Sequence, residues 1–310
     1  MKQSNNWVQR GNDMEGFFKN SIEFKENGQY LKFKNHSIFY NKIGKGETLL
    51  LLHGYPFNSY DWNWLLKDLS KHYQVIYFDF LGMGFSDKPK EHRYSFEEYV
   101  DIVKEIVKVN QLQSVRILAH DLAVSVVQEL IAVEKTLDFE IVSVAFMNGG
   151  LFTDVYKPRL IQRLLSQSPN WMGKWISNKM SRKAVESSLF RVFGPQTQPN
   201  LDLLENYWTI LNYNDGKQIT YLIGRMVFEK VKYQTRWIDA LKTTKIPFCY
   251  ICGPFDPNSG THMAKRFQNE YPNRKVYFLS DQIGHWPQVE SPSEVMLAYQ
   301  LFLKDIDQKK

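Results

Sequence analysis

Short apolar runs of strand length recur along this chain and alternate with longer segments of helical periodicity. Four of the runs carry no polar face, which is typical of strands buried on both sides of a parallel sheet: residues 48–53, 73–79, 114–119 and 141–148. Amphipathic segments at residues 96–109 and 122–133 separate the later runs. Since parallel strands need a crossover, usually a helix, this order predicts an α/β fold with a mostly parallel sheet.

The alternation is interrupted once. Between residues 151 and 240 the sequence has helical periodicity and contains no buried-strand pattern. Strands and helices resume after it, at residues 246–252, 261–270, 275–280 and 293–303, and two alternating strands precede the apolar runs, at residues 30–34 and 37–41. We therefore predict an eight-stranded sheet flanked by helices, with a core of residues 1–150 and 241–310 and an inserted helical cap domain of residues 151–240.

Composition excludes several classes of function. The chain has 39 Lys and Arg against 33 Asp and Glu, but they are scattered and form no basic stripe, so no nucleic-acid partner is expected. No apolar run reaches the roughly 18 residues that a membrane span needs. Two cysteines in 310 residues exclude a disulfide framework and indicate a reducing, cytoplasmic location. The oligomeric state stays open.

The segment Ala119-His120-Asp121-Leu122-Ala123 lies where a predicted parallel strand passes into a helix. Small residues two before and two after a central residue permit a sharp turn that projects its side chain. The central residue here is Asp121, and a carboxylate can attack an electrophilic carbon and form an ester with it. The helix that begins at Leu122 favours the ionised form of that carboxylate. His120 is expected to point away and to be structural.

An ester on Asp121 has to be hydrolysed, and this needs a base and an acid that orients the base. Asp256 follows the strand at 246–252, and His285 follows the next strand. The order nucleophile, acid, histidine is that of the α/β-hydrolase triad. These three residues are therefore the predicted catalytic set.

A tight turn is predicted at His53-Gly54-Tyr55-Pro56, with a cis peptide bond between Tyr55 and Pro56. Such a turn points the Tyr55 N–H into the site, beside the N–H of Leu122. Two backbone donors of this kind make an oxyanion hole for a tetrahedral intermediate.

These motifs resemble the epoxide hydrolase and haloalkane dehalogenase branch of the α/β-hydrolases, and the similarity is closest to the mesoderm-specific transcript proteins of that branch. The matching segments are residues 53–56, 79–89, 120–121, 253–257 and 284–288, with further matches in the cap at 148–152, 193–195 and 214–216. The resemblance implies a two-step hydrolysis without cofactor or metal, whose partners are a small-molecule substrate and water. Asp121 would open the substrate, His285 would activate water, and Asp256 would hold the imidazole.

The chain departs from the family at several positions. Ala119 and Ala123 stand where the family usually has glycine, and they crowd the turn. Dehalogenases of the branch often hold the halide with Trp after the nucleophile and Asn after His-Gly. Leu122 and Tyr55 occupy these positions, which argues against halide release as the main activity.

The leading interpretation is therefore an epoxide-hydrolase-like enzyme for a small to medium apolar substrate. Epoxide hydrolases hold the epoxide oxygen with two cap tyrosines, and the candidates for substrate contact are Tyr207, Tyr213 and Tyr221, together with Trp286 next to the histidine. Three alternatives remain open: haloalkane dehalogenation, a non-catalytic protein that binds a ligand or partner, and oxygen-dependent chemistry known on this scaffold.

Overall fold

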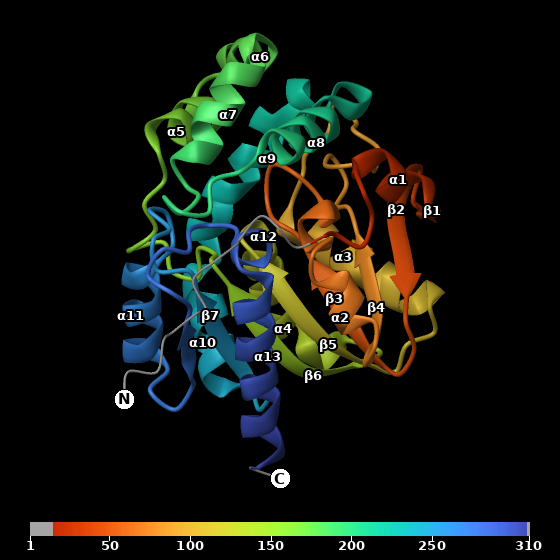
Figure 1. Cartoon of the computed structure of the whole chain (residues 1–310), viewed down its shortest axis with the longest axis vertical. Coiled ribbons are helices and arrows are strands. Elements are labelled where there is room, and N and C mark those ends of the chain that lie inside the picture. The colour runs from red at the N-terminus through yellow and green to blue at the C-terminus, as the bar shows by residue number, and fades with distance from the viewer. Residues whose placement is uncertain (1–14, 309–310) are drawn as a thin grey trace, which may run out of the picture.

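The computed structural model describes residues 15–308, so the first part of the predicted core, residues 1–14, lies outside it. One eight-stranded sheet runs through the molecule in the order β1-β2-β4-β3-β5-β6-β7-β8 (Figure 1). The first two strands pair antiparallel, and β4, β3, β5, β6, β7 and β8 are parallel. The strands are β1 (Gln29–Phe33), β2 (His36–Ile43), β3 (Glu47–Leu52), β4 (Tyr73–Phe78), β5 (Ser114–His120), β6 (Glu140–Met147), β7 (Phe248–Cys252) and β8 (Val276–Phe278).

Helices cover both faces of this sheet. Those outside the β6–β7 connection are α1 (Ser21–Glu26), α2 (Leu66–Leu69), α3 (Phe96–Val109), α4 (Leu122–Ala132), α11 (Thr261–Glu270), α12 (Pro287–Glu290) and α13 (Pro292–Asp307), with the 3₁₀ turns η1 (Ser59–Trp62) and η2 (Glu134–Thr136). One hydrophobic core lies between the sheet and α3, α4, α10 and α11, and a second lies between the other face and α1, α2 and α13. The predicted fold class is confirmed.

Local sequence explains where most elements begin and end. The helix α3 covers the predicted residues 96–109, since the Ser95 hydroxyl caps it by accepting a hydrogen bond from the Glu98 N–H at 3.2 Å. The strand β7 begins at Phe248, two residues later than predicted. Pro247 has no N–H to donate to a neighbouring strand, so the ladder starts after it.

The β6–β7 connection is helical, and in Figure 1 its helices α5 to α9 lie at one end of the sheet. It contains α5 (Leu160–Gln167), α6 (Asn170–Lys179), α7 (Arg182–Phe190), α8 (Leu201–Asn212), η3 (Tyr213–Asp215), α9 (Gly216–Glu229), η4 (Lys230–Lys232) and α10 (Gln234–Thr243). The helix α10 packs on α4, and the Trp237 indole donates to Glu129 at 2.6 Å. The boundary expected at residue 240 thus falls inside α10, and the division into core and cap domains stays a prediction.

Among residues 15–308, no helix has the length and apolar character that a bilayer crossing requires.

Asp79, directly after β4, connects two loops at the carboxyl edge of the sheet. Its fully buried carboxylate accepts hydrogen bonds from the Ser59 N–H at 2.9 Å, the Asn58 amide at 3.0 Å and the Phe85 N–H at 2.7 Å, and the Ser59 hydroxyl also donates to it. The loop that follows the Tyr55-Pro56 turn is therefore fixed to the loop that follows β4.

We expect Asp79→Ala to lower the free energy of unfolding by about 3 kcal/mol, because it leaves several buried donors without an acceptor. Urea denaturation followed by circular dichroism measures this change. The matched control is Asp68→Ala, which removes an exposed ion pair with Lys71 and should change stability by less than about 1 kcal/mol. Equal effects of the two substitutions would contradict the assignment.

Candidate active site

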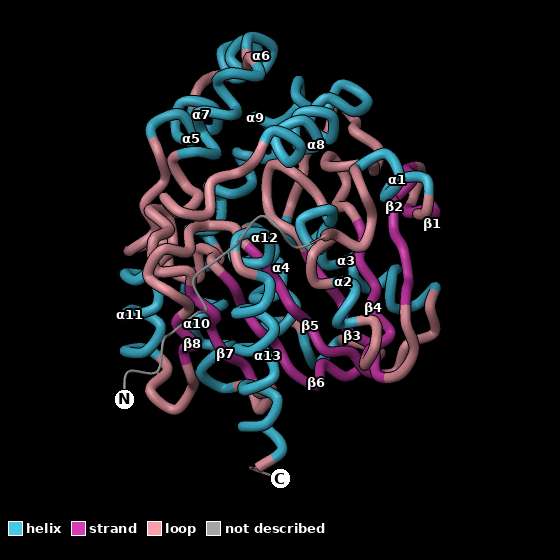
Figure 2. Tube along the Cα trace, viewed as in Figure 1, coloured by secondary structure: helices cyan, strands magenta, loops and turns pink. Residues whose placement is uncertain are grey.

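The carboxyl ends of β3, β5 and β7 meet at the edge of the sheet that lies beneath α8 and α9 (Figures 1 and 2). Contacts from both helices reach this edge: the Tyr207 hydroxyl donates to Asp61 at 2.7 Å, and the Tyr55 hydroxyl donates to the Thr220 carbonyl at 3.0 Å. The loops after the three strands carry Tyr55, Asp121 and Asp256. This placement follows from parallel strands, which bring the ends of distant segments together.

Asp121 occupies a strained turn between β5 and α4. Its backbone has φ 50° and ψ −110°, outside the regions favoured by residues with a side chain. Two glycines leave room for the turn: a Cβ on Gly54 would lie 2.6 Å from the Asp121 Cβ, and one on Gly149 would lie 2.7 Å from the Asp121 carbonyl oxygen. Ala119 and Ala123, which were expected to crowd this turn, are both fully buried.

The two carboxylate oxygens of Asp121 have different partners. Oδ1 accepts a hydrogen bond from the Tyr55 N–H at 2.9 Å, and Oδ2 lies 3.4 Å from His285 Nε2. The peptide bond between Tyr55 and Pro56 is cis, as predicted. Leu122 is the buried first residue of α4, and its role as a second backbone donor stays a prediction. One oxygen is thus held by the backbone while the other faces the imidazole.

Asp256 holds the other side of the imidazole. Its Oδ2 lies 2.8 Å from His285 Nδ1 and also accepts hydrogen bonds from the Ser259 hydroxyl at 2.6 Å and the Asn148 amide at 3.1 Å. Oδ1 accepts from the Asn258 N–H at 2.8 Å. Asp256 and His285 are both buried. The predicted set of Asp121, Asp256 and His285 therefore lies in one row, with a hydrogen bond between His285 and Asp256 and an ion-pair contact between His285 and Asp121.

The two carboxylates decide the charge of the imidazole. Burial alone would lower the pKa of His285, but the charge of Asp256 and the hydrogen bonds to Asp121 and Asp256 outweigh it and raise this pKa to about 10. Burial opposes ionisation of the carboxylates too, and the positive imidazole nevertheless holds the pKa of Asp121 and of Asp256 below the usual value. At neutral pH the row is an imidazolium between two carboxylates.

His120 contacts the backbone of His285. Its Nε2 lies 2.7 Å from the carbonyl oxygen of His285, and its ring is fully buried. Burial, followed by the charge of His285, lowers the pKa of His120 to about 4, so its imidazole is neutral. This contact agrees with the structural role expected for His120.

The substrate-contact candidates are dispersed. Tyr207 stacks on Phe57 with ring centres 4.1 Å apart, and Trp286 stands edge-on to the His285 ring at 4.7 Å. Tyr213 lies against Phe85, and the Tyr221 ring lies beneath Arg225. Within residues 15–308, none of these side chains hydrogen-bonds to Asp121, Asp256 or His285, so their contact with substrate stays a prediction.

Three polar side chains at this edge, of which Asp61 and Lys230 are buried, were missed by sequence reasoning. Asp61 accepts hydrogen bonds from the Tyr207 hydroxyl and from the Trp286 indole at 3.1 Å, and burial raises its pKa to about 7. Tyr156 and Lys230 are packed together, with the ammonium 3.9 Å from the ring centre. The available signal for Asp61 was its position close after the His53-Gly54-Tyr55-Pro56 turn; Lys230 has no comparable signal.

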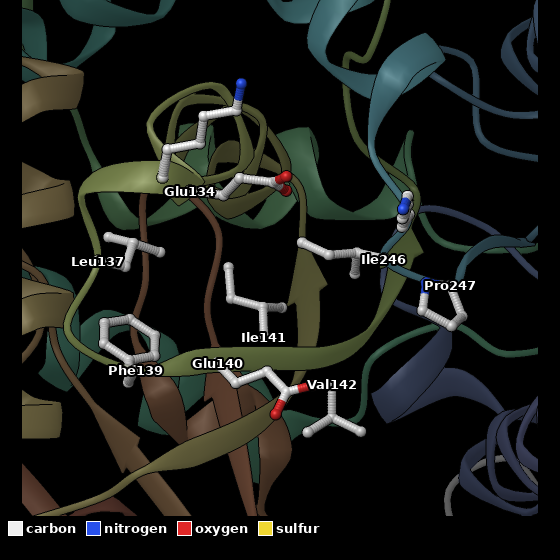
Figure 3. Close-up of a pocket in the computed structure, with 10 residues that line it drawn as sticks. Glu134, Leu137, Phe139, Glu140, Ile141, Val142, Ile246 and Pro247 are labelled. Atoms are coloured by element: carbon white, nitrogen blue, oxygen red, sulfur yellow. The ribbon is translucent and has the colours of Figure 1, made fainter.

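A hollow of about 360 Å³ lies at the opposite edge of the sheet, where β6 and β7 begin. Leu137, Ile141 and Ile246 point into it in Figure 3, and Glu134 lies at its rim. None of the predicted site residues lines this hollow. In the described part of the chain, no group of three His, Cys, Asp or Glu side chains is arranged to hold a metal ion.

Comparison with known proteins agrees with the fold. Residues 47–292 match the alpha/beta hydrolase fold family. The chain is similar to the mesoderm-specific transcript protein of Mus musculus, with 33% identity over 291 residues that cover 90% of this chain and 87% of the relative. These matches confirm the resemblance stated from the motifs.

Two solved structures illustrate the likeness in fold. The epoxide hydrolase CorEH without ligand has a TM-score of 0.73 at 17% identity, covering 90% of this chain and 99% of that chain. The haloalkane dehalogenase DatA from Agrobacterium tumefaciens C58 has a TM-score of 0.74 at 19% identity, covering 90% and 96%.

The charge of His285 predicts a measurable pH dependence of stability. Its pKa is about 10 in the folded protein and about 6.5 in the unfolded chain, so its stabilising contribution is complete below pH 6.5 and is lost as the pH rises to 10. We expect the stability advantage of the wild type over His285→Gln to fall by on the order of 3 kcal/mol between pH 7 and pH 10, measured by urea denaturation.

The exposed His72 provides the control, since the difference between the wild type and His72→Gln should be flat over this range. A His285→Gln difference that is equally flat would show that the imidazole is not charged in the folded protein.

Proposed function

Because the chain belongs to the alpha/beta hydrolase fold family, we propose that it is a hydrolase that opens small to medium apolar epoxides through a covalent ester on Asp121. The observation that supports this most is that the two oxygens of the Asp121 carboxylate have different partners. Tyr55 N–H binds Oδ1, and Oδ2 faces His285, which Asp256 holds from the other side. In this proposal residues 151–240 form a cap over the site, and the protein's partners are a small-molecule substrate and water.

The first step is attack by Oδ2 of Asp121 on an epoxide carbon. Oδ2 is the less constrained oxygen, and the Asp121 side chain keeps about 15% of its surface accessible. The low pKa of Asp121 keeps it ionised and nucleophilic. After attack Oδ1 becomes the carbonyl oxygen of the ester, already bound to the Tyr55 N–H.

Ester formation itself prepares the base for the second step. As an imidazolium, His285 cannot accept a proton from water. Esterification removes the charge of Asp121, which is one of the two groups that raise the pKa of His285. The imidazole can then lose its proton to solvent and act as a general base, with Asp256 still holding Nδ1.

In the second step His285 takes a proton from a water molecule that attacks the ester carbonyl carbon. Negative charge develops on Oδ1, where the Tyr55 N–H is already placed to stabilise it. Collapse of the tetrahedral intermediate releases the diol and restores Asp121. The donor predicted at Leu122 would complete the oxyanion hole.

The covalent intermediate can be trapped. In His285→Ala the first step should proceed and the second should stop, so incubation with styrene oxide is expected to add one substrate mass to the protein, on the peptide that contains Asp121. Intact-protein and peptide mass spectrometry measure this. His72→Ala, which removes an exposed imidazole, should turn over styrene oxide like the wild type.

The same experiment separates the alternatives. Bromide release from 1-bromohexane without diol formation from styrene oxide would favour a haloalkane dehalogenase. Absence of any adduct on Asp121 with both compounds would favour a non-catalytic binding protein and reject this proposal. Product formation that requires oxygen would indicate the oxygen-dependent alternative.

A further inference from the structure

Lys230, the first residue of η4, places a buried ammonium group in the structure that forms no ion pair with a carboxylate within residues 15–308. The residue is only 6% exposed. Its Nζ is 3.9 Å from the centre of the Tyr156 ring and donates one long hydrogen bond, 3.4 Å, to the Gly150 carbonyl. A buried charge held this weakly is costly to the fold, which points to a function.

The ammonium lies close to the turn that carries Asp121, across the Gly149-Gly150 pair. A Cβ on Gly150 would lie 2.2 Å from Nζ, and a Cβ on the preceding Gly149 would lie 2.7 Å from the Asp121 carbonyl oxygen. The Gly149-Gly150 pair is therefore packed between the turn that carries Asp121 and the ammonium of Lys230. The negative charge of Asp121 also opposes the effect of burial on the pKa of Lys230.

We propose that Lys230 is the acid that gives a proton to the oxygen of the opening epoxide ring, an inference that rests on the proposed function. The site would thus be specific for substrates whose leaving group is an oxygen that stays attached to the product. Epoxides have this property, and alkyl halides do not.

The proton and electron balance closes over the two steps. When Asp121 Oδ2 bonds to a ring carbon, the C–O bond breaks, its electron pair goes to the oxygen, and Lys230 gives that oxygen a proton. In the second step His285 takes a proton from water and returns it to the alkoxide that leaves the ester. Asp121 emerges protonated and releases that proton to solvent, and Lys230 and His285 regain from solvent the protons that they gave up, so one epoxide and one water give one diol.

Two tyrosine hydroxyls at this edge donate their protons elsewhere, which favours Lys230 as the donor. The Tyr207 hydroxyl donates to Asp61, and the Tyr55 hydroxyl donates to the Thr220 carbonyl. The aromatic face of Tyr156 stabilises the cation without accepting its proton.

The strength of this acid suits the reaction. Burial lowers the pKa of Lys230 to about 8, against the opposing charge of Asp121, so that the group is protonated at neutral pH and is a stronger acid than an exposed lysine. Esterification of Asp121 removes the opposing charge as the alkoxide forms. Proton transfer therefore becomes easier as the reaction proceeds.

The titratable groups near Lys230 determine how a pH dependence of the first step can be assigned. Tyr156 faces it from the loop after β6, with Arg159 behind, and Asp121 lies across the glycine pair. On its own element, Lys232 pairs with Glu229 at 3.4 Å and is exposed. A pH dependence near 8 in the first step can thus be assigned to Lys230, since His285 is absent from the trapping variant.

The test uses Lys230→Met and Lys230→Arg, each combined with His285→Ala, and measures the rate of ester formation on Asp121 by quenched-flow mass spectrometry. We expect Lys230→Met to slow the reaction with styrene oxide by roughly 10²–10⁴-fold. In the parent protein, which carries only His285→Ala, this rate should fall above about pH 8. Lys230→Arg should abolish that fall because a guanidinium keeps its charge. Any reaction with 1-bromohexane should slow far less. The control is Lys232→Met, with no change expected.

If the role of Lys230 were purely structural, Lys230→Met would lower the melting temperature. We expect instead that Lys230→Met melts at or above the temperature of the parent, since the substitution removes an unpaired buried charge. A reaction of Lys230→Met with styrene oxide at the parent rate, or an unchanged pH profile in Lys230→Arg, would overturn the inference while leaving the proposed function intact. No adduct with styrene oxide in His285→Ala alone would instead reject the proposed function, and this inference with it.

Discussion

One buried imidazole between two carboxylates organises the candidate site. His285 lies 2.8 Å from Asp256 and 3.4 Å from Asp121, and each ionised group lowers the cost of burying the others. The row depends on the fold around it, because Asp121, Asp256 and His285 come from three loops that only a parallel sheet brings to the same edge. The strained turn at Asp121 is maintained by this packing, with Gly54 and Gly149 pressed against it.

The charge of this row connects structure to the proposed chemistry. The free site balances two negative groups with two positive ones, His285 and Lys230. Formation of an ester removes one negative charge and leaves an excess of positive charge at the moment when an alkoxide appears. The same event lowers the pKa of the imidazole toward the range of a general base. A single covalent step thus changes the protonation of two neighbouring groups in the direction that the next step requires.

Much of the fold follows directly from residue patterns, whereas part of the site does not. Continuous apolar runs mark β3 to β6, and Ser95 marks the start of α3, because these signals act over a few neighbouring residues. The positions of Asp121, Asp256 and His285 were predictable because each follows a strand.

The packing of the helices between β6 and β7 was harder to predict from the sequence, since the face that each one turns toward the sheet is set by contacts between distant segments. Tyr207 was named as a candidate for substrate contact, and the hydrogen bond from its hydroxyl to Asp61 had no signal in the sequence. Lys230 follows Glu229 and precedes Val231 in a polar stretch that resembles a surface. It is buried against Tyr156 and Gly150, which lie far away in the sequence. Long-range contacts of this kind leave no local pattern.

The central claim is that the carboxylate of Asp121 enters the reaction as a covalent partner, and isotope transfer tests it most directly. One turnover of styrene oxide by the wild-type protein in excess, carried out in H₂¹⁸O, should place the heavy oxygen in the peptide that contains Asp121 and leave the first diol unlabelled. Water adds to the ester carbonyl in this account, so the product oxygen comes from the carboxylate. Heavy oxygen in the first diol, with none in the Asp121 peptide, would mean that water attacks the substrate directly and would contradict the account.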